Sequence, residues 1–464
     1  MAPDQQERIH KTWIHSDLFI PRRFMRPIQD FMRIEAAAGL IMLIAAVVAI
    51  VWANATFGES YFRFLETEVA FELGSFHLEL HFGHLINDGF MAIFFFVVGL
   101  EIKREMVLGE LRDRKAAMLP LMAALGGMVF PALIYLAFNL GDPAALRGWG
   151  VPMATDIAFS VGVLSLMGKR VPSAAKLFLL ALAIVDDLGG ILVIAVFYTE
   201  ELNLLYLGGG LALLVLVWLA SRAGIRSYVF YVPVAVAIWY LFLQSGVHAT
   251  LAGVALGFLT PARPMYSVGE FDRKARLILD TYPAVAETPE DREHADHEAL
   301  LLAEITREAV APLARNEHRL AWWSSFAVIP VFALANAGVR FEGSIIDALL
   351  SPVALGVGLG LVVGKTVGIS LFSWLAVRLG LARLPKDTTW RQVVGVAATA
   401  GIGFTVALFI TALAYTDLVL ADDAKVGIFA GSITAGLIGA AILLTGKSKH
   451  QGVDTAIETV EVTA

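Results

Sequence analysis

Long apolar runs recur along most of this 464-residue chain and constrain its fold more than any other feature. They begin near residue 34 and end near residue 446, and many could cross a ~30 Å hydrocarbon core as a helix. Hydrophobic residues make up 58% of the chain and charged residues 17%, whereas soluble domains are about half apolar and about a quarter charged. The sequence therefore predicts an all-α polytopic membrane protein.

Twelve apolar segments are predicted to form transmembrane helices within a domain over 34–446. The sequence contains 35 Lys and Arg residues, and basic residues concentrate on the cytoplasmic side of membrane proteins. With the N-terminus inside, 30 of the 35 fall in cytoplasmic segments and four outside, while Lys365 lies within a span. Both termini are therefore predicted to be cytoplasmic. The segments are 34–54, 85–100, 116–140, 150–168, 174–198, 203–221, 227–243, 246–260, 319–338, 351–377, 392–415 and 425–446.

The polar parts of the chain are predicted to lie outside the membrane. Residues 1–33 and 447–464 form cytoplasmic ends, and the polar start argues for a retained anchor rather than a cleaved signal. In the external loop 55–84, alternation over 62–81 predicts a β-hairpin around Gly74-Ser75. Its free edges could pair with a second copy of the chain; an independent flap is the alternative.

A second polar part, the cytoplasmic loop 261–318, is rich in acidic residues. Its middle, TPEDREHADHE, is predicted to be disordered or solvated, and helical periodicity returns over 297–318. The chain has no cysteine, which excludes disulfides and thiolate sites. Neither a cofactor nor a nucleic-acid partner is predicted.

Four ionisable residues lie well inside predicted spans: Asp156, Asp186, Asp187 and Lys365. A charge near the bilayer centre costs about 2.5–3.5 kcal/mol on insertion scales. Three carboxylates and one ammonium are difficult to explain as buried polar residues with a purely structural role, so they are predicted to be functional.

Asp186 and Asp187 are neighbours in LALAIVDDLGGILVIAVF. On a helix they point about 100° apart, so one can face an aqueous cavity while the other faces a second helix. A deprotonated carboxylate supplies oxygen ligands for Na⁺ or Li⁺, and burial favours its protonated form. Proton and cation would compete for the same oxygens, which is sufficient to couple two opposed fluxes.

Two spans are predicted to be interrupted. Pro152, Thr155 and Gly162 break the fourth, and Thr399–Thr405 breaks the eleventh. Unwound backbone at membrane depth occurs where it is buried in protein or lines a cavity, and paired interrupted spans indicate a midplane transport site in an inverted-repeat transporter. Asp156 and Lys365 are the candidates to offset the half-helix ends.

Lys365 lies beside a ladder of glycines at four-residue spacing, which is typical of close helix packing. Its ammonium needs a buried acidic partner, and Asp186 is the predicted one. The ladder comprises Gly356, Gly360, Gly364 and Gly368.

Three further residues have ordinary explanations from the sequence alone. Glu101 and Glu105 are one turn apart at the end of the second span, where charged residues are common. His248 begins the eighth span, where a hydrated interface histidine is expected.

Seven stretches closely resemble the bacterial NhaA-type sodium/proton antiporters, in register over about residues 30–445. NhaA is itself an example of an inverted-repeat transporter, so the resemblance and the interrupted spans are not independent. The stretches are INDGFMAIFFFVVGLEIKRE, PMATDIAFSVGVL, ALAIVDDLGGILVIAVFYT, SGVHATLAGV, FALANAGV, VGKTVGISLFSWLAVRL and AGIGFTVALFI.

The resemblance implies twelve helices with inverted repeats and two broken, crossing helices. It also implies a homodimer joined by the external hairpin, in the bacterial inner membrane. Internal Na⁺ or Li⁺ would be exchanged for external H⁺, electrogenically and under pH control. By this match, Asp187 is the main cation- and proton-binding carboxylate, and Asp186 pairs with Lys365 in one state. Asp156 and Thr155 belong to the crossing.

The resemblance also assigns a pH-responsive cluster of Glu101, Glu105, Glu317 and His318, and a pH-modulating role to His248. One departure stands out: relatives typically read Leu-His-Pro-Trp where this chain reads Leu-Ala-Trp-Trp from residue 320. A histidine of the cluster is therefore missing at Ala321, and an altered or weaker pH switch is predicted.

The leading alternative is a sodium-coupled organic-anion symporter on a similar scaffold, which does not require the adjacent Asp pair. An intramembrane protease fits poorly, because Asp187 is followed by Leu188-Gly189 and lacks the Gly-x-Gly-Asp context of aspartyl enzymes. The predicted activity is transport, not catalysis.

Overall fold

The computed structural model describes residues 37–445 apart from 74–75, 200–201, 284, 286, 342–343 and 386–387. The predicted terminal segments 1–33 and 447–464 and the Gly74-Ser75 turn lie outside this part. The chain divides into two compact units. The first contains residues up to 62, 118–186 and from 333 onward; the second contains 63–117 and 187–332.

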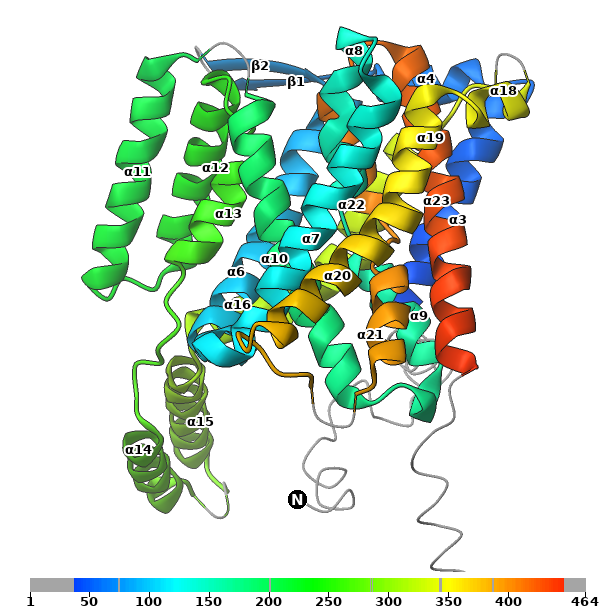
Figure 1. Cartoon of the computed structure of the whole chain (residues 1–464). Coiled ribbons are helices and arrows are strands. Elements are labelled where there is room, and N and C mark those ends of the chain that lie inside the picture. Colours follow the sequence, from blue (N-terminus) through cyan, green and yellow to red (C-terminus); the bar gives the residue numbers. More distant parts are fainter. Residues whose placement is uncertain are drawn as a thin grey trace, which may run out of the picture. The chain divides into compact units, whose positions relative to one another are not determined.

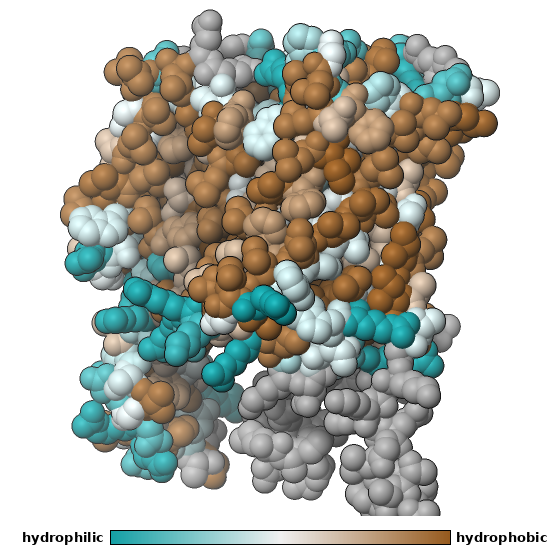
Figure 2. Space-filling model, viewed as in Figure 1, coloured by the Kyte–Doolittle hydropathy of each residue, from teal (hydrophilic) through white to brown (hydrophobic). Residues whose placement is uncertain are grey.

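Within the described residues, seven helices are long and apolar enough to cross a membrane, or up to nine if each of two bent pairs is one span. Exposed side chains on these helices are apolar, as Leu133, Leu371 and Leu437 illustrate, and Figure 2 shows hydrophobic residues over α7, α20 and α23. The seven are α3 (Ala37–Asn54), α5–η3–α6 (Phe82–Val107), α7 (Arg114–Asn139), α10 (Ser173–Phe197), α11 (Leu204–Arg222), α19–η8–α20 (Pro352–Arg378) and α23 (Leu418–Leu444).

Two bent helix pairs lie in the first unit, at the interruptions that the sequence predicts. The segment α8–η5 (Pro143–Met153) meets α9 (Ile157–Leu166) at 44°, and α21 (Trp390–Thr399) meets α22 (Phe404–Ala414) at 46°. Pro152 lacks a backbone N–H, and Gly401 and Gly403 weaken helix continuation, which accounts for the breaks. Shorter elements are α4 (Glu59–Leu65), η6 (Gly168–Arg170), α17 (Ile329–Asn336) and α18 (Ile345–Leu349).

The glycine ladder packs the segment α19 (Pro352–Leu359), η8 (Gly360–Gly364) and α20 (Lys365–Arg378) against neighbouring backbone. A Cβ on Gly368 would lie 2.1 Å from the carbonyl oxygen of Gly126 on α7, and one on Gly364 would lie 2.7 Å from Pro131 Cα. The ladder therefore permits close approach of two helices, as its spacing predicts.

Replacing Gly368 by Ala is expected to destabilise the protein by about 1–3 kcal/mol, because the new methyl group overlaps a backbone oxygen. Thermal unfolding of the purified protein measures the loss. Gly358→Ala is the matched control on the same segment, since its Cβ would meet Gly427 O at an ordinary 3.5 Å. Equal stability of the two variants would contradict the packing role.

The second unit contains the predicted hairpin. Strands β1 (Glu68–Leu73) and β2 (Phe76–His81) pair antiparallel, with Leu73 opposite Phe76. The sequence placed the start of this hairpin at residue 62, which is wrong, because residues 62–65 end helix α4. The unit also contains α12 (Tyr228–Gln244), α13 (Thr250–Leu259) and η4 (Glu110–Arg112).

Helices occupy most of the described part of 261–318, which contradicts a disordered middle, while the exposed charged side chains there agree with the solvated alternative. Helices α14 (Val268–Thr281) and α15 (Pro289–Ala309) pack side by side as a helical hairpin (Figure 1), followed by α16 (Pro312–Trp323) and η7 (Ser324–Val328). The stretch TPEDREHADHE begins α15: Thr288 and Asp291 form a capping box, and Pro289 occupies the first turn. These features stabilise a helix start despite the high charge.

Candidate functional site

The two helix breaks of the first unit lie against each other. The backbone N–H of Asp156 donates to the carbonyl oxygen of Ile402 at 2.6 Å. The hydroxyl of Ser160 donates to Thr399 O at 3.1 Å. Polar backbone freed by each break is thus satisfied by the other, which is the condition for unwound chain at membrane depth.

The Asp156 carboxylate joins the N-terminal ends of both half-helices. Asp156 is the N-cap of α9 and accepts from Phe159 N at 3.0 Å. Its second oxygen accepts from Thr405 N at 3.1 Å and Thr405 Oγ1 at 2.7 Å, at the start of α22. Helix N-termini carry partial positive charge, so a carboxylate between two of them is stabilised.

Lys365 and Asp186 form a fully buried ion pair. Lys365 Nζ donates to Asp186 Oδ2 at 2.6 Å and to Thr155 Oγ1 at 2.9 Å, and the lysine side chain is 0% exposed. This is the partner that the sequence predicts for Lys365. Thr155 Oγ1 lies 2.8 Å from Asp186 Oδ2 and 2.9 Å from Ala400 O, and its single hydrogen serves one acceptor at a time.

Asp187 follows Asp186 near the middle of α10 and is 3% exposed. Neighbouring positions on an α-helix are rotated by about 100°, so the two side chains leave the helix in different directions. Asp186 Oδ1 is buried without a hydrogen-bond donor among the described residues. A carboxylate oxygen in this situation suits a hard cation.

In the part of the chain that the structure describes, no group of three or more His, Asp and Glu side chains could hold a metal ion. That Asp186 and Asp187 are ligands of a transported Na⁺ or Li⁺ stays a prediction from the sequence.

A second polar cluster lies between α6 and α16 in the second unit. Arg104 forms an ion pair with Glu317 through Nη1, and its Nη2 lies 3.2 Å from Glu105 Oε1. Glu317, Arg104 and Glu105 are also the charged neighbours of Glu101. The structure thus brings Glu317 together with Glu101 and Glu105, the two glutamates that the sequence alone left as an ordinary helix end.

Burial raises the pKa of the Glu317 carboxyl above its usual range, and Arg104 opposes this shift. The carboxyl therefore holds its proton to higher pH than an exposed glutamate. As pH rises through that pKa, Glu317 becomes the anionic partner of Arg104.

Of the two predicted histidines, His248 lies apart from this ion pair, whereas His318 is a charged neighbour of Glu317. His248 precedes α13, and its Nε2 lies 2.6 Å from Tyr198 O, so this nitrogen carries the hydrogen. The ion-pair cluster is near the other end of α13, where Lys103 is bound, about 15 Å along the helix. His318 is exposed.

Two contacts were not predicted from the sequence. Lys103 Nζ donates to Phe258 O at 2.7 Å and Thr260 O at 2.5 Å at the end of α13. Basic groups favour such ends, but only the fold brings Lys103 there. The role of the Thr405 hydroxyl was also missed, although its place just after Gly403 marks it as the first turn of a half-helix.

Comparison with known proteins places the chain among transporters. It matches the family described as Na⁺/H⁺ antiporter 1 over residues 29–443. It is 45% identical over 434 residues to a Na⁺/H⁺ antiporter NhaA of Syntrophobacter fumaroxidans, covering 92% of each chain. A NhaA of Anaeromyxobacter sp. is 47% identical over 420 residues, covering 90% of this chain and 91% of the relative. One of Rhodopirellula baltica is 45% identical over 427 residues, covering 91% and 94%.

The match covers both helix breaks, the buried ion pair and the glutamate cluster. The family consists of transporters rather than enzymes, and the apolar helices agree with a multi-pass membrane protein. The chain therefore belongs to the Na⁺/H⁺ antiporter family to which these NhaA proteins belong.

Proposed function

We propose that this protein exchanges internal Na⁺ or Li⁺ for external H⁺ by competition at Asp187 and Asp186. The observation that carries this proposal is the buried carboxylate pair in α10 beside the Lys365 ammonium. A deprotonated carboxylate binds the cation and a protonated one does not, so the two ions occupy the site alternately. Two carboxylates permit two protons per cation, which makes the exchange electrogenic.

Asp156, Thr155 and Lys365 hold the site rather than exchange ions in this proposal. Asp156 offsets two helix N-termini, and Lys365 neutralises Asp186 in the state described here. Release of Asp186 from Lys365 would expose a second titratable carboxylate during the cycle.

The sodium-coupled organic-anion symporter gains no support, because the matching family is one of antiporters. A symporter would also take up solute together with Na⁺, whereas competition at one site opposes the two fluxes.

The architecture proposed with this function has twelve spans, inverted repeats and crossing broken helices. Seven long helices, two bent pairs and the shorter α12 and α13 support it, and residues 324–336 add a further apolar helical stretch. The 30 of 35 basic residues assigned to one side support cytoplasmic termini in the bacterial inner membrane. The β1–β2 hairpin has edges suited to pairing in a homodimer.

A dye assay of the pH gradient in everted membrane vesicles tests the exchange. Addition of Na⁺ or Li⁺ should collapse a preformed acid-inside gradient in vesicles that contain the protein. K⁺ is the ionic control and vesicles without the protein are the background. Collapse that requires an added organic anion would favour the symporter.

Glu317→Gln is expected to flatten the dependence of antiport rate on pH. The amide resembles the protonated carboxyl, so the variant cannot form the Arg104 ion pair as pH rises through the raised pKa of Glu317. The vesicle assay repeated across pH measures this slope. Glu304→Gln on α15 is the matched control, because Glu304 is exposed.

A weaker pH switch is also proposed because Ala321 stands where relatives typically have histidine. A sharply gated profile that ignores substitution of both Glu317 and His318 would contradict a role for this cluster.

A further inference from the structure

An excess of positive charge surrounds one buried glutamate at the end of α15. Glu308 Oε2 lies 2.9 Å from Arg226 Nη1, and its Oε1 lies 3.4 Å from Arg307 Nε and 3.8 Å from Arg315 Nη1. One carboxylate thus faces three guanidinium groups, which never lose their charge at ordinary pH. Two positive charges remain without an anion within this group.

A cavity of about 810 Å³ opens beside this group, lined by α14, α15 and α16. One part of its wall is apolar and includes Leu279, Tyr282, Leu302 and Ala303. The other part is basic and includes Arg307, Arg315, His318 and Arg319. Ligand pockets of about 300–1,000 Å³ with apolar walls and a few polar groups are typical of small-molecule sites.

Arg315 is built into this wall rather than lying on the surface. It is only 9% exposed, and its Nη1 donates to Arg307 O at 2.9 Å. Its Nε is buried and has no hydrogen-bond acceptor among the residues that the structure describes. A buried donor without an acceptor is costly, so a turn of the Arg315 guanidinium that brings Nε to an anion in the cavity would be favoured.

We propose that the cavity formed by α14, α15 and α16 binds a phosphate ester that carries an apolar or aromatic group. The planar guanidinium of Arg315 matches the geometry of phosphate oxygens. The apolar group of the ester would cover Leu302, Leu279 and the ring of Tyr282. The phosphate would supply negative charge to balance the guanidinium charges that Glu308 alone does not neutralise.

Calorimetry with the purified full-length protein and 1-naphthyl phosphate as the probe tests this site without any transport measurement. Inorganic phosphate and naphthyl methanol separate the two halves of the proposed ligand, and both should bind at least tenfold more weakly than the probe. Equal affinity for the probe and naphthyl methanol would overturn the role of the arginines.

Two variants address the cavity directly. Ala303→Trp places a large side chain in the cavity without changing a charge, and the affinity for the probe should fall at least tenfold. Arg315→Lys keeps the charge but loses the planar guanidinium with its paired N–H donors. The affinity for the probe should fall about tenfold, the loss expected for a hydrogen bond to a charged group. Thermal unfolding of each variant verifies that it is folded.

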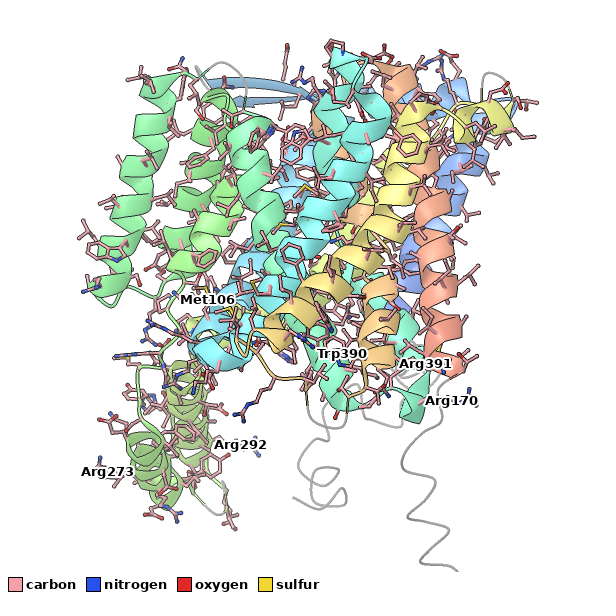
Figure 3. All side chains as sticks on the ribbon, viewed as in Figure 1. Met106, Arg170, Arg273, Arg292, Trp390 and Arg391 are labelled. Carbon is pink, nitrogen blue, oxygen red and sulfur yellow. The ribbon has the colours of Figure 1, made fainter. Side chains whose placement is uncertain are left out.

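Arg292→Gln is the matched control, because Arg292 is exposed on the same helix as Ala303 and does not line the cavity. In Figure 3, Arg292 and Arg273 lie on the outer sides of the helical hairpin. Probe binding should be unchanged in this variant. Wild-type affinity in a folded Ala303→Trp protein would overturn the proposal.

Two sources could supply such a phosphate, a soluble ester or a lipid headgroup. Detergent solution without added lipid, nanodiscs of phosphatidylcholine alone and nanodiscs that include phosphatidylglycerol distinguish them. If the lipid of either nanodisc weakens probe binding to the wild type relative to lipid-free detergent, but does not weaken probe binding to Arg315→Lys, the site takes lipid phosphate. If probe affinity is the same in lipid-free detergent and in both nanodiscs, the source is a soluble ester.

Discussion

Asp187→Asn is expected to reduce the Na⁺- and Li⁺-dependent collapse of a pH gradient to the background of vesicles without the protein. Asn has nearly the same shape as Asp, but it neither binds a proton nor carries the negative charge that a cation requires. Because Asp187 is buried at 3% exposure, bulk water cannot replace the missing ligand. The loss should be complete at every pH tested.

The result is meaningful only if the variant reaches the membrane in a folded form. Its amount in the vesicles and its thermal unfolding should match the wild type, since burying an amide costs less than burying a charge. Asp347→Asn on α18 is the control, because that aspartate is exposed. Wild-type transport by Asp187→Asn would remove Asp187 from the transport site.

Lys365→Ala is expected to lower stability by about 3–5 kcal/mol, the usual cost of leaving one member of a buried ion pair unpartnered. Asp186 would keep Thr155 as a hydrogen-bond neighbour but lose its ammonium. Thermal unfolding in detergent measures the loss. Residual transport in the same variant would mark the lysine as structural.

Two further variants separate the ion pair from general effects of mutation. The double variant Asp186→Asn with Lys365→Met removes both charges and should recover much of the stability. Lys425→Met is the matched control: Lys425 also lies in an apolar helix, but its pair with Asp422 is about one-fifth exposed. Lys425 also donates to Gly338 O at 2.9 Å, so Lys425→Met should lower stability, but by less than Lys365→Ala. Equal stability of Lys365→Ala and the wild type would contradict a stabilising role for the buried pair.

The helix breaks and the buried charges could be predicted from the sequence, because each violates a strong rule. Pro152 and the glycines near Gly401 stand where a continuous helix should run. Asp186 and Lys365 lie where charge is costly, and each needs an opposite charge within reach. These local rules led to the Asp186–Lys365 pair, which the structure contains.

Contacts that depend on the fold could not be predicted in the same way. Nothing in the sequence around Arg104 identifies Glu317, more than two hundred residues later, as its partner. The error over α15 was different in kind, since the Thr288–Asp291 capping box and Pro289 were visible in the sequence. High charge was given too much weight there, and local capping decided the structure.

The π-helical turn η8 immediately before Lys365 has a consequence for chain length. A π-turn contains one residue more than an α-helical turn, so the helical faces before and after it are offset by about 100°. Deleting one residue from this turn would restore regular hydrogen bonding but rotate α19 against α20. The packing of Gly356 on α7 and the direction of the Lys365 ammonium could then not both be kept. The number of residues in this turn is therefore as much a part of the ion site as the charges are.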